Sequence, residues 1–380
     1  MYKPIKVLLL SFVPLELEGA GTARLLIRLA DFLSKKTNIE LEICTLGPAN
    51  KKAFFNGCRY TTFRGFKLRF LQDISPSKIR YVLGRRGDHL RVLIVGTCLT
   101  DILIALSLRL FSPGTRIVQI PQIQRDFVFR NKIAKFLYKL RKWVFVYFIN
   151  FKIVQPTLIV YSREEEDMVR PFVRNIIRRP LGIELKYVDR HGDKKSNVDI
   201  CGKKLTLLHV GDIHRNKFPL FALEVMKKLK EVTGGKVKLI AVGRIHSGHY
   251  KKLREKMREY GVENTIRFTG LVSGDELLKY WESADVFVLF SASEGSPHVV
   301  FEAMLHRVPV VATRVGIVPE LEARGTLLAA EYGDVDGMTK HILKLRKDKK
   351  LIASLVQKAM RDLPNYDVKY FLETVYHTLL

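Results

Sequence analysis

Cysteine is scarce in this 380-residue chain, and its four cysteines lie far apart. They form no C-x-x-C pair and no Cys/His cluster at zinc spacing, so the sequence predicts neither a disulfide framework nor a structural zinc site. No apolar run reaches the roughly 18 residues that a membrane-spanning helix needs, so we expect no segment to cross a bilayer. Low-complexity tracts and short repeats are also missing, which argues against disorder and against a solenoid. We expect reduced thiols of a cytosolic protein at Cys44, Cys58, Cys98 and Cys201.

Acidic residues are in short supply as well. Against 65 Lys and Arg there are 38 Asp and Glu, which gives a net charge of +27. Residues 1–190 hold 34 basic and 15 acidic residues, an excess of 19, whereas the remainder holds 31 and 23, an excess of 8. Such an excess favours an anionic partner: nucleic acid, anionic lipid or a phosphorylated substrate. The alternative is an ordinary Lys/Arg-rich solvated surface of the kind that thermophile proteins carry.

Short apolar runs alternate with amphipathic segments along both halves of the chain. In the second half, "LTLLHVG", "VKLIAVG", "TIRFTG", "DVFVLFS" and "PVVAT" are each separated by a helical pattern. This alternation is typical of parallel sheets covered by helices, so the fold class is predicted to be α/β with two doubly wound, Rossmann-like domains. We expect an N-terminal domain at 1–190, a polar linker at 191–204, a second domain at 205–355, and C-terminal helices at 356–380 that cross back to the first domain.

The stretch "SASEGSPHVVFEAMLHRVPVVATRVGIVPEL", residues 291–321, holds two glutamates in a chain that is otherwise rich in bases. Glu294 lies in a loop after the buried strand "DVFVLF", where ligands bind in open α/β sheets, and Glu302 lies within the helix that follows. Ser296 is expected to cap this helix with Pro297 at its first position, which leaves N–H groups free for a diphosphate. A carboxylate matches the vicinal diol of a ribose or hexose. By spacing alone, however, two such glutamates are more typical of a solvated helix surface.

The wider context resembles the nucleotide-sugar signature of retaining GT-B glycosyltransferases, specifically the family-four group. The E-x7-E pair, "EG", "EAM", "PVVAT", Gly316 and Pro319–Glu320 all match in register. "LLHVGDIHRNK" resembles the G-R-x-x-x-x-K turn of that group, with Gly211 and Lys217 matching, and "GAGT" resembles its glycine loop. The resemblance covers nearly the whole chain and is strongest from about 205 to 340.

This resemblance implies a GT-B architecture, in which two Rossmann-like domains face a central cleft. It also implies an enzyme that moves a sugar from a UDP- or GDP-linked donor with retention of configuration and without a metal or another cofactor. The implied catalytic residues are Glu294 at the transferred sugar, with Lys217 and Arg215 at the leaving diphosphate. The implied donor-binding residues are Glu302 at the ribose, Gly211, Gly295, Ser296, His298, Val299, Gly243, Gly19 and Gly21.

The chain departs from the family pattern at several positions. Asp212 stands where the family has an arginine, so either Arg215 or His214 is expected to supply the cation, and Asp212 either caps the turn or pairs with Arg215. The histidine of the family's N-terminal domain has no clear counterpart in "IVQIPQIQRDF". Gln122 and Gln124 occupy about the place of this histidine, so we expect them near the acceptor and the sugar. Two glycines of the family pattern are also replaced, by Arg307 and Ile317. These departures indicate a divergent subgroup, with an inactive relative as the alternative.

Residues 130–154 are basic and rich in aromatic side chains. Eight basic residues and no acid lie between Asp126 and Glu164, a composition typical of helices that bind membrane surfaces. The alternative is a core helix whose lysines reach the solvent at its rim. Together with the charge of the first half, this segment predicts a lipid-linked or phosphorylated acceptor and a cytoplasmic protein held peripherally at the inner face of the membrane.

Two other interpretations concern a metal and a nucleic acid. The close pair His246 and His249 lacks a carboxylate or cysteine at matching spacing, so we interpret both as loop histidines rather than metal ligands. A non-catalytic or nucleic-acid-binding protein on the same fold is the rival to the enzyme. Because RNP, KH and helix-turn-helix features are absent from the sequence, we expect no nucleic-acid partner.

Overall fold

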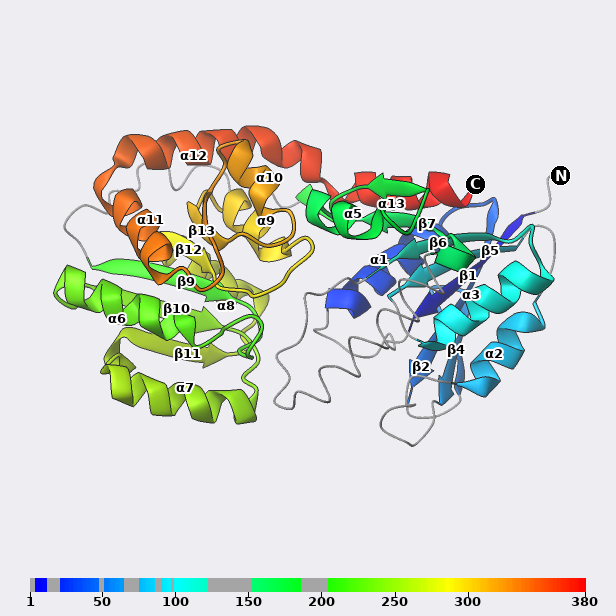
Figure 1. Cartoon of the computed structure of the whole chain (residues 1–380), viewed down its shortest axis with the longest axis horizontal. Coiled ribbons are helices and arrows are strands. Elements are labelled where there is room, and N and C mark those ends of the chain that lie inside the picture. The colour runs from blue at the N-terminus through cyan, green and yellow to red at the C-terminus, as the bar shows by residue number, and fades with distance from the viewer. Residues whose placement is uncertain are drawn as a thin grey trace. The chain divides into compact units, whose positions relative to one another are not determined.

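The computed structural model describes residues 4–11, 21–47, 51–64, 75–85, 90–96, 99–121, 152–185 and 204–380. The chain divides into two compact units (Figure 1): unit 1 comprises Met1–Arg179 with Lys369–Leu380, and unit 2 comprises Pro180–Val368. The division therefore falls before the boundary expected at residue 190.

The sequence predicts that residues 356–380 cross back to the first domain. Of this segment, only Lys369–Leu380 is grouped with unit 1. The physical reason is burial, because Ala359, Leu363 and Tyr366 belong to the hydrophobic core of unit 2. The expected linker 191–204 lies outside the described residues except for Lys204.

Unit 1 contains an eight-stranded sheet with the order β3-β4-β2-β1-β5-β6-β7-β8. Its strands pair in parallel, except that β3 and β4 form an antiparallel hairpin. The strands are β1 (Ile5–Ser11), β2 (Ile39–Gly47), β3 (Lys51–Phe55), β4 (Cys58–Arg64), β5 (Leu90–Val95), β6 (Arg116–Ile120), β7 (Thr157–Val160) and β8 (Ile176–Arg178). The helices are α1 (Gly21–Ser34), α2 (Pro76–Leu83), α3 (Leu99–Phe111), α5 (Arg163–Val169) and α13 (Val368–Leu379).

Helix α13 is built into unit 1 by contacts with residues far away in the sequence. Phe371, Val375 and Leu379 of this helix are buried. Tyr376 donates a hydrogen bond from its hydroxyl to Asn38 Oδ1 at 3.1 Å. Arg91 donates from Nε to the carbonyl of Leu379 at 3.1 Å, which satisfies one of the carbonyls left open at the end of the helix.

Unit 2 contains a six-stranded parallel sheet with the order β11-β10-β9-β12-β13-β14. In the chain order of this unit the arrangement is 3-2-1-4-5-6, the strand order of dinucleotide-binding folds. The strands are β9 (Leu205–Val210), β10 (Val237–Val242), β11 (Ile266–Gly270), β12 (Val286–Leu289), β13 (Val310–Thr313) and β14 (Leu328–Ala330). The helices are α6 (Phe221–Thr233), α7 (Ser247–Tyr260), α8 (Gly274–Ser283), α9 (His298–Leu305), α10 (Val318–Ala323), α11 (Val335–Lys347) and α12 (Lys349–Asp362).

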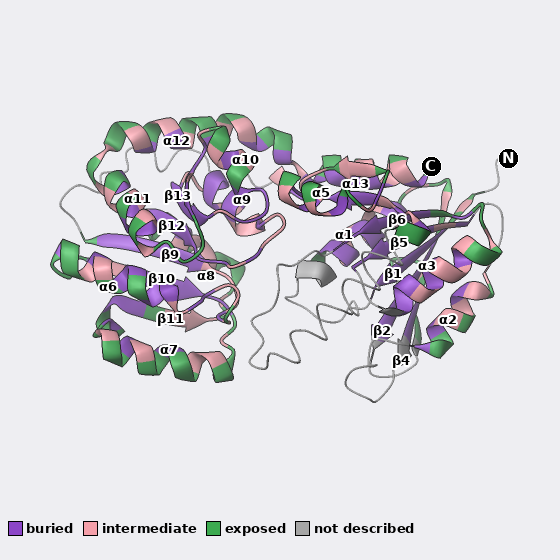
Figure 2. Ribbon diagram, viewed as in Figure 1, coloured by how far each residue is buried: buried purple, intermediate pink, exposed green. Residues whose placement is uncertain are grey.

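The four central strands of unit 2, β10, β9, β12 and β13, are almost wholly buried, as Figure 2 shows by their purple colour, whereas the edge strand β11 is mostly half-buried. Side chains alternate between the faces of a strand, so Leu205 and Leu207 of β9 join the core on one side while Leu208 joins the core on the other. This burial explains why β9 is a nearly continuous apolar run. The predicted fold class, two Rossmann-like α/β domains, is confirmed.

Some sequence predictions concern residues that the structure describes only in part. Cys44 and Cys58 are free thiols, whereas Cys98 and Cys201 lie outside the described residues. The basic segment 130–154 also lies outside them, apart from 152–154. Within the described ranges, no helix combines the length and apolar character needed to span a membrane.

Candidate functional site

The loops that follow β9 and β12 meet at the carboxyl edge of the sheet in unit 2. The strand order reverses between these two neighbouring strands, which is the position where ligands bind in open α/β sheets. The loops are tied together by hydrogen bonds. Ala292 donates its backbone N–H to the carbonyl of Asn216 at 2.7 Å, and the side-chain amide of Asn216 donates to the carbonyl of Ser293 at 3.3 Å. The sequence predicted functional residues on both loops, and the fold makes the loops neighbours.

Lys217 and Glu294 form an ion pair across these loops. The Lys217 Nζ lies 3.0 Å from Glu294 Oε1, with 38% of the lysine side chain and 13% of the glutamate side chain exposed. Ser291 donates from its hydroxyl to Glu294 Oε1 at 2.8 Å, and buried Thr313 donates to the carbonyl of Ser291 at 2.6 Å. A chain of contacts that begins on β13 thus orients the carboxylate and, through it, the ammonium group.

Two glycines allow the loops of the site to approach one another. Gly316 has a φ of +55°, and a Cβ atom there would lie 2.2 Å from the carbonyl oxygen of Gly295. The next residue, Ile317, donates its N–H to the same carbonyl at 3.0 Å. A Cβ atom on Gly243 would lie 2.1 Å from the carbonyl oxygen of Gly211. Larger residues at these positions would push the loops apart.

Helix α9 begins beside the ion pair, at His298 rather than at Pro297. The expected cap at Ser296 is wrong, because Pro297 occupies the N-cap position and forms no side-chain cap bond. The cap moves by one residue because the extended φ and ψ of Pro297 are those of an N-cap. The Ser296 Oγ is buried and has no hydrogen-bond partner among the described residues. With no acid in its first turn, the amino end of α9 is suited to an anion.

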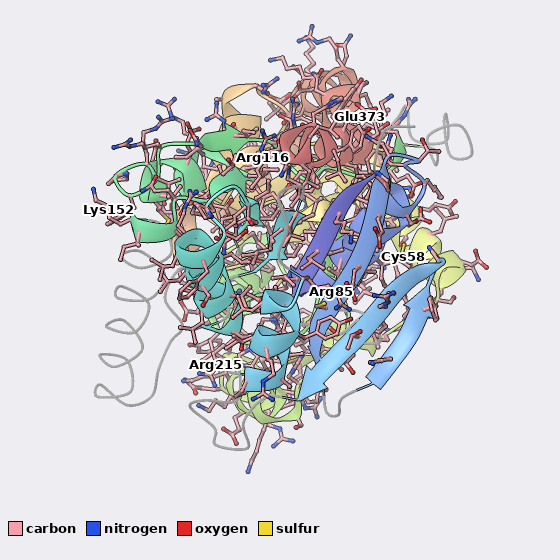
Figure 3. All side chains as sticks on the ribbon, turned by 90° about the vertical axis from the view of Figure 1, so that its right-hand side faces the viewer. Cys58, Arg85, Arg116, Lys152, Arg215 and Glu373 are labelled. Carbon is pink, nitrogen blue, oxygen red and sulfur yellow. The ribbon has the colours of Figure 1, made fainter. Side chains whose placement is uncertain are left out.

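His298 and Glu302 lie four residues apart and therefore share one face of α9. The ring of His298 donates from Nδ1 to the carbonyl of Gly182 at 2.7 Å. Val299 in the first turn and Glu302 in the middle of the helix are both half-buried. Arg215 is exposed on the loop after β9 and is labelled in Figure 3.

Residues 192–362 match the family described as glycosyl transferases group 1. These residues form a glycosyltransferase group 1 domain. The chain is 33% identical over 169 residues to a sulfoquinovosyl transferase of Arabidopsis thaliana, a match that spans 43% of this chain and 31% of that protein. It is 28% identical over 166 residues to an alpha-monoglucosyldiacylglycerol synthase of Streptococcus pneumoniae, across 41% of this chain and 36% of the relative. Less than half of each relative is therefore matched.

The crystal structure of HepE of Anabaena in complex with UDP is similar over 98% of this chain and 99% of that one, with a TM-score of 0.70 and 14% identity. At this identity the similarity concerns the fold alone, and the fold of the chain is GT-B.

Within the glycosyltransferase group 1 domain, Asp212 lies against a histidine. His246 Nε2 is 3.4 Å from Asp212 Oδ2, and the ring of His246 packs edge-on against that of His214 at 5.3 Å. Burial, followed by the charges of His246 and Lys217, lowers the pKa of His214.

The prediction that His249 lies in a loop is wrong, because this residue lies in the first turn of α7. Its Nε2 contacts the carbonyl of Phe218 at 2.7 Å. Throughout the described parts of the chain, no three His, Cys, Asp or Glu side chains gather in a way that could hold a metal ion.

His209, on β9 of the same domain, was missed by sequence reasoning. It is fully buried, its Nδ1 lies 3.1 Å from the carbonyl of Val288, and its Nε2 has no partner among the described residues. Burial lowers the pKa of His209 to about 4, so the ring is neutral at pH 7. Its ring packs against Phe218 and Phe290. The signal in the sequence is a single polar residue in the apolar run "LLHVG".

Four of the predicted residues, Gly19, Gly21, Gln122 and Gln124, belong to the first half of the chain. Gly21 is the first residue of α1 in unit 1. Gly19, Gln122 and Gln124 lie outside the described residues.

Proposed function

We propose that the protein is a retaining glycosyltransferase that moves a sugar from a UDP- or GDP-linked donor to an acceptor. The observation that carries this proposal is the Lys217–Glu294 ion pair at the switch point of a glycosyltransferase group 1 domain. The pair brings a cation for a diphosphate and a carboxylate for sugar hydroxyls to the same place. The UDP bound to HepE, which shares the fold, supports a nucleotide-sugar donor.

In this proposal the donor diphosphate lies between Lys217, Arg215 and the amino end of α9. Departure of the diphosphate concentrates negative charge on its oxygens, and fixed positive groups stabilise that charge more in the transition state than in the ground state. At the amino end of the helix, the N–H groups of His298 and Val299 and the hydroxyl of Ser296 donate hydrogen bonds to the same diphosphate. No metal or other cofactor takes part, because these groups supply the positive charge.

The two glutamates have separate roles in the proposed reaction. Glu294 accepts hydrogen bonds from hydroxyls of the transferred sugar, and Glu302 accepts them from the ribose. The diphosphate competes with Glu294 for Lys217, so donor binding frees the carboxylate while Ser291 keeps it oriented. Gly211, Gly243 and Gly295 let the backbone approach the nucleotide closely.

Retention of configuration follows from attack on the face that the diphosphate leaves. The bond between the anomeric carbon and the phosphate oxygen breaks, the acceptor oxygen bonds to the same face, and the leaving phosphate takes the acceptor proton. A protein nucleophile is not needed on this route. Such a route suits a site whose principal carboxylate, Glu294, is paired with a lysine.

We further propose a lipid-linked or phosphorylated acceptor at the cytoplasmic face of the membrane. The first 190 residues carry an excess of 19 basic residues, and the basic segment 130–154 lies among them. Electrostatic attraction to anionic lipid grows with each such residue. The name of the Streptococcus pneumoniae relative, which refers to a glucosyl lipid, supports a lipid acceptor.

The donor test measures the melting temperature of the full chain with a panel of UDP- and GDP-sugars in buffer containing EDTA. We expect one donor to raise the melting temperature, and Glu302→Ala to weaken its binding about 10-fold or more, because a charged hydrogen bond contributes about 1.5–3 kcal/mol. The matched control is Glu282→Ala, which removes an exposed glutamate from α8 of the same unit.

Two outcomes would reject parts of this proposal. Unchanged donor binding by Glu302→Ala would show that the ribose assignment is wrong. Stabilisation by DNA or RNA, with no response to any sugar nucleotide, would favour the non-catalytic, nucleic-acid-binding alternative.

A further inference from the structure

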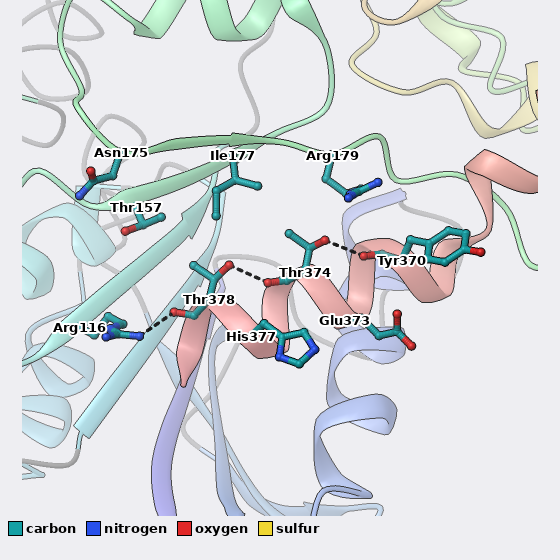
Figure 4. Close-up of a pocket in the computed structure, with 10 residues that line it drawn as sticks. All are labelled: Arg116, Thr157, Asn175, Ile177, Arg179, Tyr370, Glu373, Thr374, His377 and Thr378. Atoms are coloured by element: carbon teal, nitrogen blue, oxygen red, sulfur yellow. Dashed lines mark hydrogen bonds between the residues drawn. The ribbon is translucent and has the colours of Figure 1, made fainter.

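A pocket of about 690 Å³ opens in unit 1, between helix α13 and strands β6, β7 and β8. Figure 4 shows the residues that line it. None of them takes part in the proposed sugar transfer, whose described residues belong to unit 2.

The two walls of the pocket each present one face of a regular element. On α13, Tyr370, Thr374 and Thr378 recur at every fourth residue and therefore form a stripe along the helix. On β8 and its flanks, Asn175 and Arg179 are four residues apart and project to the same side of the strand. The pocket is thus built from rigid elements on both sides.

Arg179 supplies a hydrogen-bond donor that none of the described protein groups uses. Its Nε is buried and has no hydrogen-bond partner among the described residues. The neighbouring Arg178 points to the other side of the strand and forms an ion pair with Glu166 Oε2 at 3.4 Å. Leaving the buried Nε–H without an acceptor is costly, so an anion oxygen that reaches this atom would stabilise it.

Arg116 adds a second charge that lacks a carboxylate partner in the described part of the chain. Its only protein bond there is a long one, 3.4 Å from Nη1 to the carbonyl of Thr378. Burial and then the positive charge of Arg116 lower the pKa of nearby Arg91. The acid that lines the pocket, Glu373, is exposed and points away from Arg179 in Figure 4. The pocket therefore has a net positive character.

The threonine hydroxyls on α13 offer hydrogen-bond acceptors, whereas the arginines offer donors. Thr374 donates its hydroxyl hydrogen to the carbonyl of Tyr370 at 2.7 Å, and Thr378 donates to the carbonyl of Thr374 at 2.6 Å. With the hydrogens committed to the helix, each oxygen presents only lone pairs to the pocket. These oxygens accept hydrogen bonds from ligand hydroxyls, whereas the arginines donate to ligand phosphate oxygens.

We propose that this pocket binds a phosphorylated polyol, with its phosphate on Arg179 and its hydroxyls on Thr374 and Thr378. Neither an inorganic anion nor a neutral sugar satisfies both sets of groups. Arg116 strengthens the attraction for the phosphate from the other end of the pocket. This site does not depend on sugar transfer.

The test is calorimetric titration of the full chain with glycerol phosphate at low salt, where charged contacts are least screened. Arg179→Gln is expected to weaken binding about tenfold or more, because it removes a charged pair of hydrogen bonds. The matched control is Arg178→Gln, which removes the same charge from the opposite face of the strand. Thr374→Val should weaken glycerol phosphate binding while leaving the weaker binding of inorganic phosphate unchanged.

Circular dichroism checks that each variant folds, and Thr374→Val tests the site independently if Arg179→Gln does not fold. Equal losses from Arg178→Gln and Arg179→Gln would mean diffuse charge attraction and overturn the site. Inorganic phosphate that binds as tightly as glycerol phosphate would overturn the role of the threonines, and no binding of either would overturn the proposal.

The source of the polyol is identified by competition. Phosphatidylglycerol vesicles that displace bound glycerol phosphate from the native protein identify a lipid head group, and vesicles that do not displace it identify a soluble ligand. Glu302→Ala should bind glycerol phosphate normally, which separates failure of this proposal from failure of the proposed sugar transfer.

Discussion

At the scale of single residues, the neighbours of a side chain decide its chemistry. Glu294 is one of 38 acids in a chain with 65 bases, and its partner Lys217 lies 77 residues earlier in the sequence. His209 illustrates the same point for a buried base. Its ring packs against two phenylalanines, and one ring nitrogen has no partner in the described parts of the chain, so the protonated form is strongly disfavoured.

His209 should make the stability of unit 2 sensitive to acid. Its pKa is lowered from 6.5 to about 4, so the unfolded chain binds a proton below pH 6.5 that the folded chain does not bind. The free energy of unfolding should therefore fall as the pH drops from 6.5 to 4, by up to about 3 kcal/mol. His209→Phe, which fits the same aromatic surroundings, should flatten this dependence in urea unfolding at pH 5 and pH 7. An identical dependence in the variant would contradict the assignment.

At the scale of elements, the residues Ser162 and Glu165 form a helix cap from a short local pattern. Ser162 caps α5 and accepts a hydrogen bond from the N–H of Glu165 at 3.3 Å, as the S-x-x-E pattern indicates. The carboxylate of Glu165 accepts from the N–H of Tyr161 at 2.7 Å. Glu165 is also buried, and this burial raises its pKa to about 8.

Glu165→Gln should stabilise unit 1 in alkaline solution. Because the pKa of the folded state lies above the usual value of 4.5, the folded protein loses stability as the pH rises from 4.5 through 8. Glutamine keeps the acceptor oxygen for Tyr161 and carries no charge to bury. The melting temperature of the variant should exceed that of the native protein at pH 8.5 and approach it at pH 5. Ser162→Ala is the control, since loss of the cap should cost about 1 kcal/mol at both pH values. A difference for Glu165→Gln that does not change with pH would contradict this prediction.

At the scale of the whole molecule, charge is divided unequally along the chain. Residues 1–190 carry most of the excess of 27 positive charges, and unit 1 holds nearly all of these residues. A single-sign excess of this kind produces a long-range field that salt screens.

The full chain should float with vesicles that contain anionic lipid at low salt and remain unbound at high salt. Replacing Lys135, Lys139, Arg141 and Lys142 of the basic segment by glutamine should reduce flotation strongly, because each base contributes about 1 kcal/mol near an anionic surface. Replacing Lys227, Lys228, Lys251 and Lys252 of unit 2 removes the same charge and serves as the control. A native protein that fails to float at low salt would rule out the membrane association.

Much of the fold could be predicted because its signals are local. Each apolar run of unit 2 marks a strand, and the helical patterns between the runs favour parallel pairing. The boundary between the units could not be predicted, since Pro180–Val368 are grouped by contacts rather than by composition. The cap of α9 was misplaced by one residue because proline is usually found at N1, whereas the extended φ and ψ of Pro297 place it at the N-cap.

The sequence by itself determined the fold class and the chemical types gathered around β9 and β12, because periodicity and glycine spacing are properties of short segments. Only the tertiary structure decided which of those groups touch. The pairing of Lys217 with Glu294 depends on two strands meeting at the point where the sheet reverses its order. The pocket beside α13 likewise joins Arg116 to Thr378, 262 residues apart. Contacts at such separations depend on strand order and register, and neither can be predicted from the pattern of a short segment.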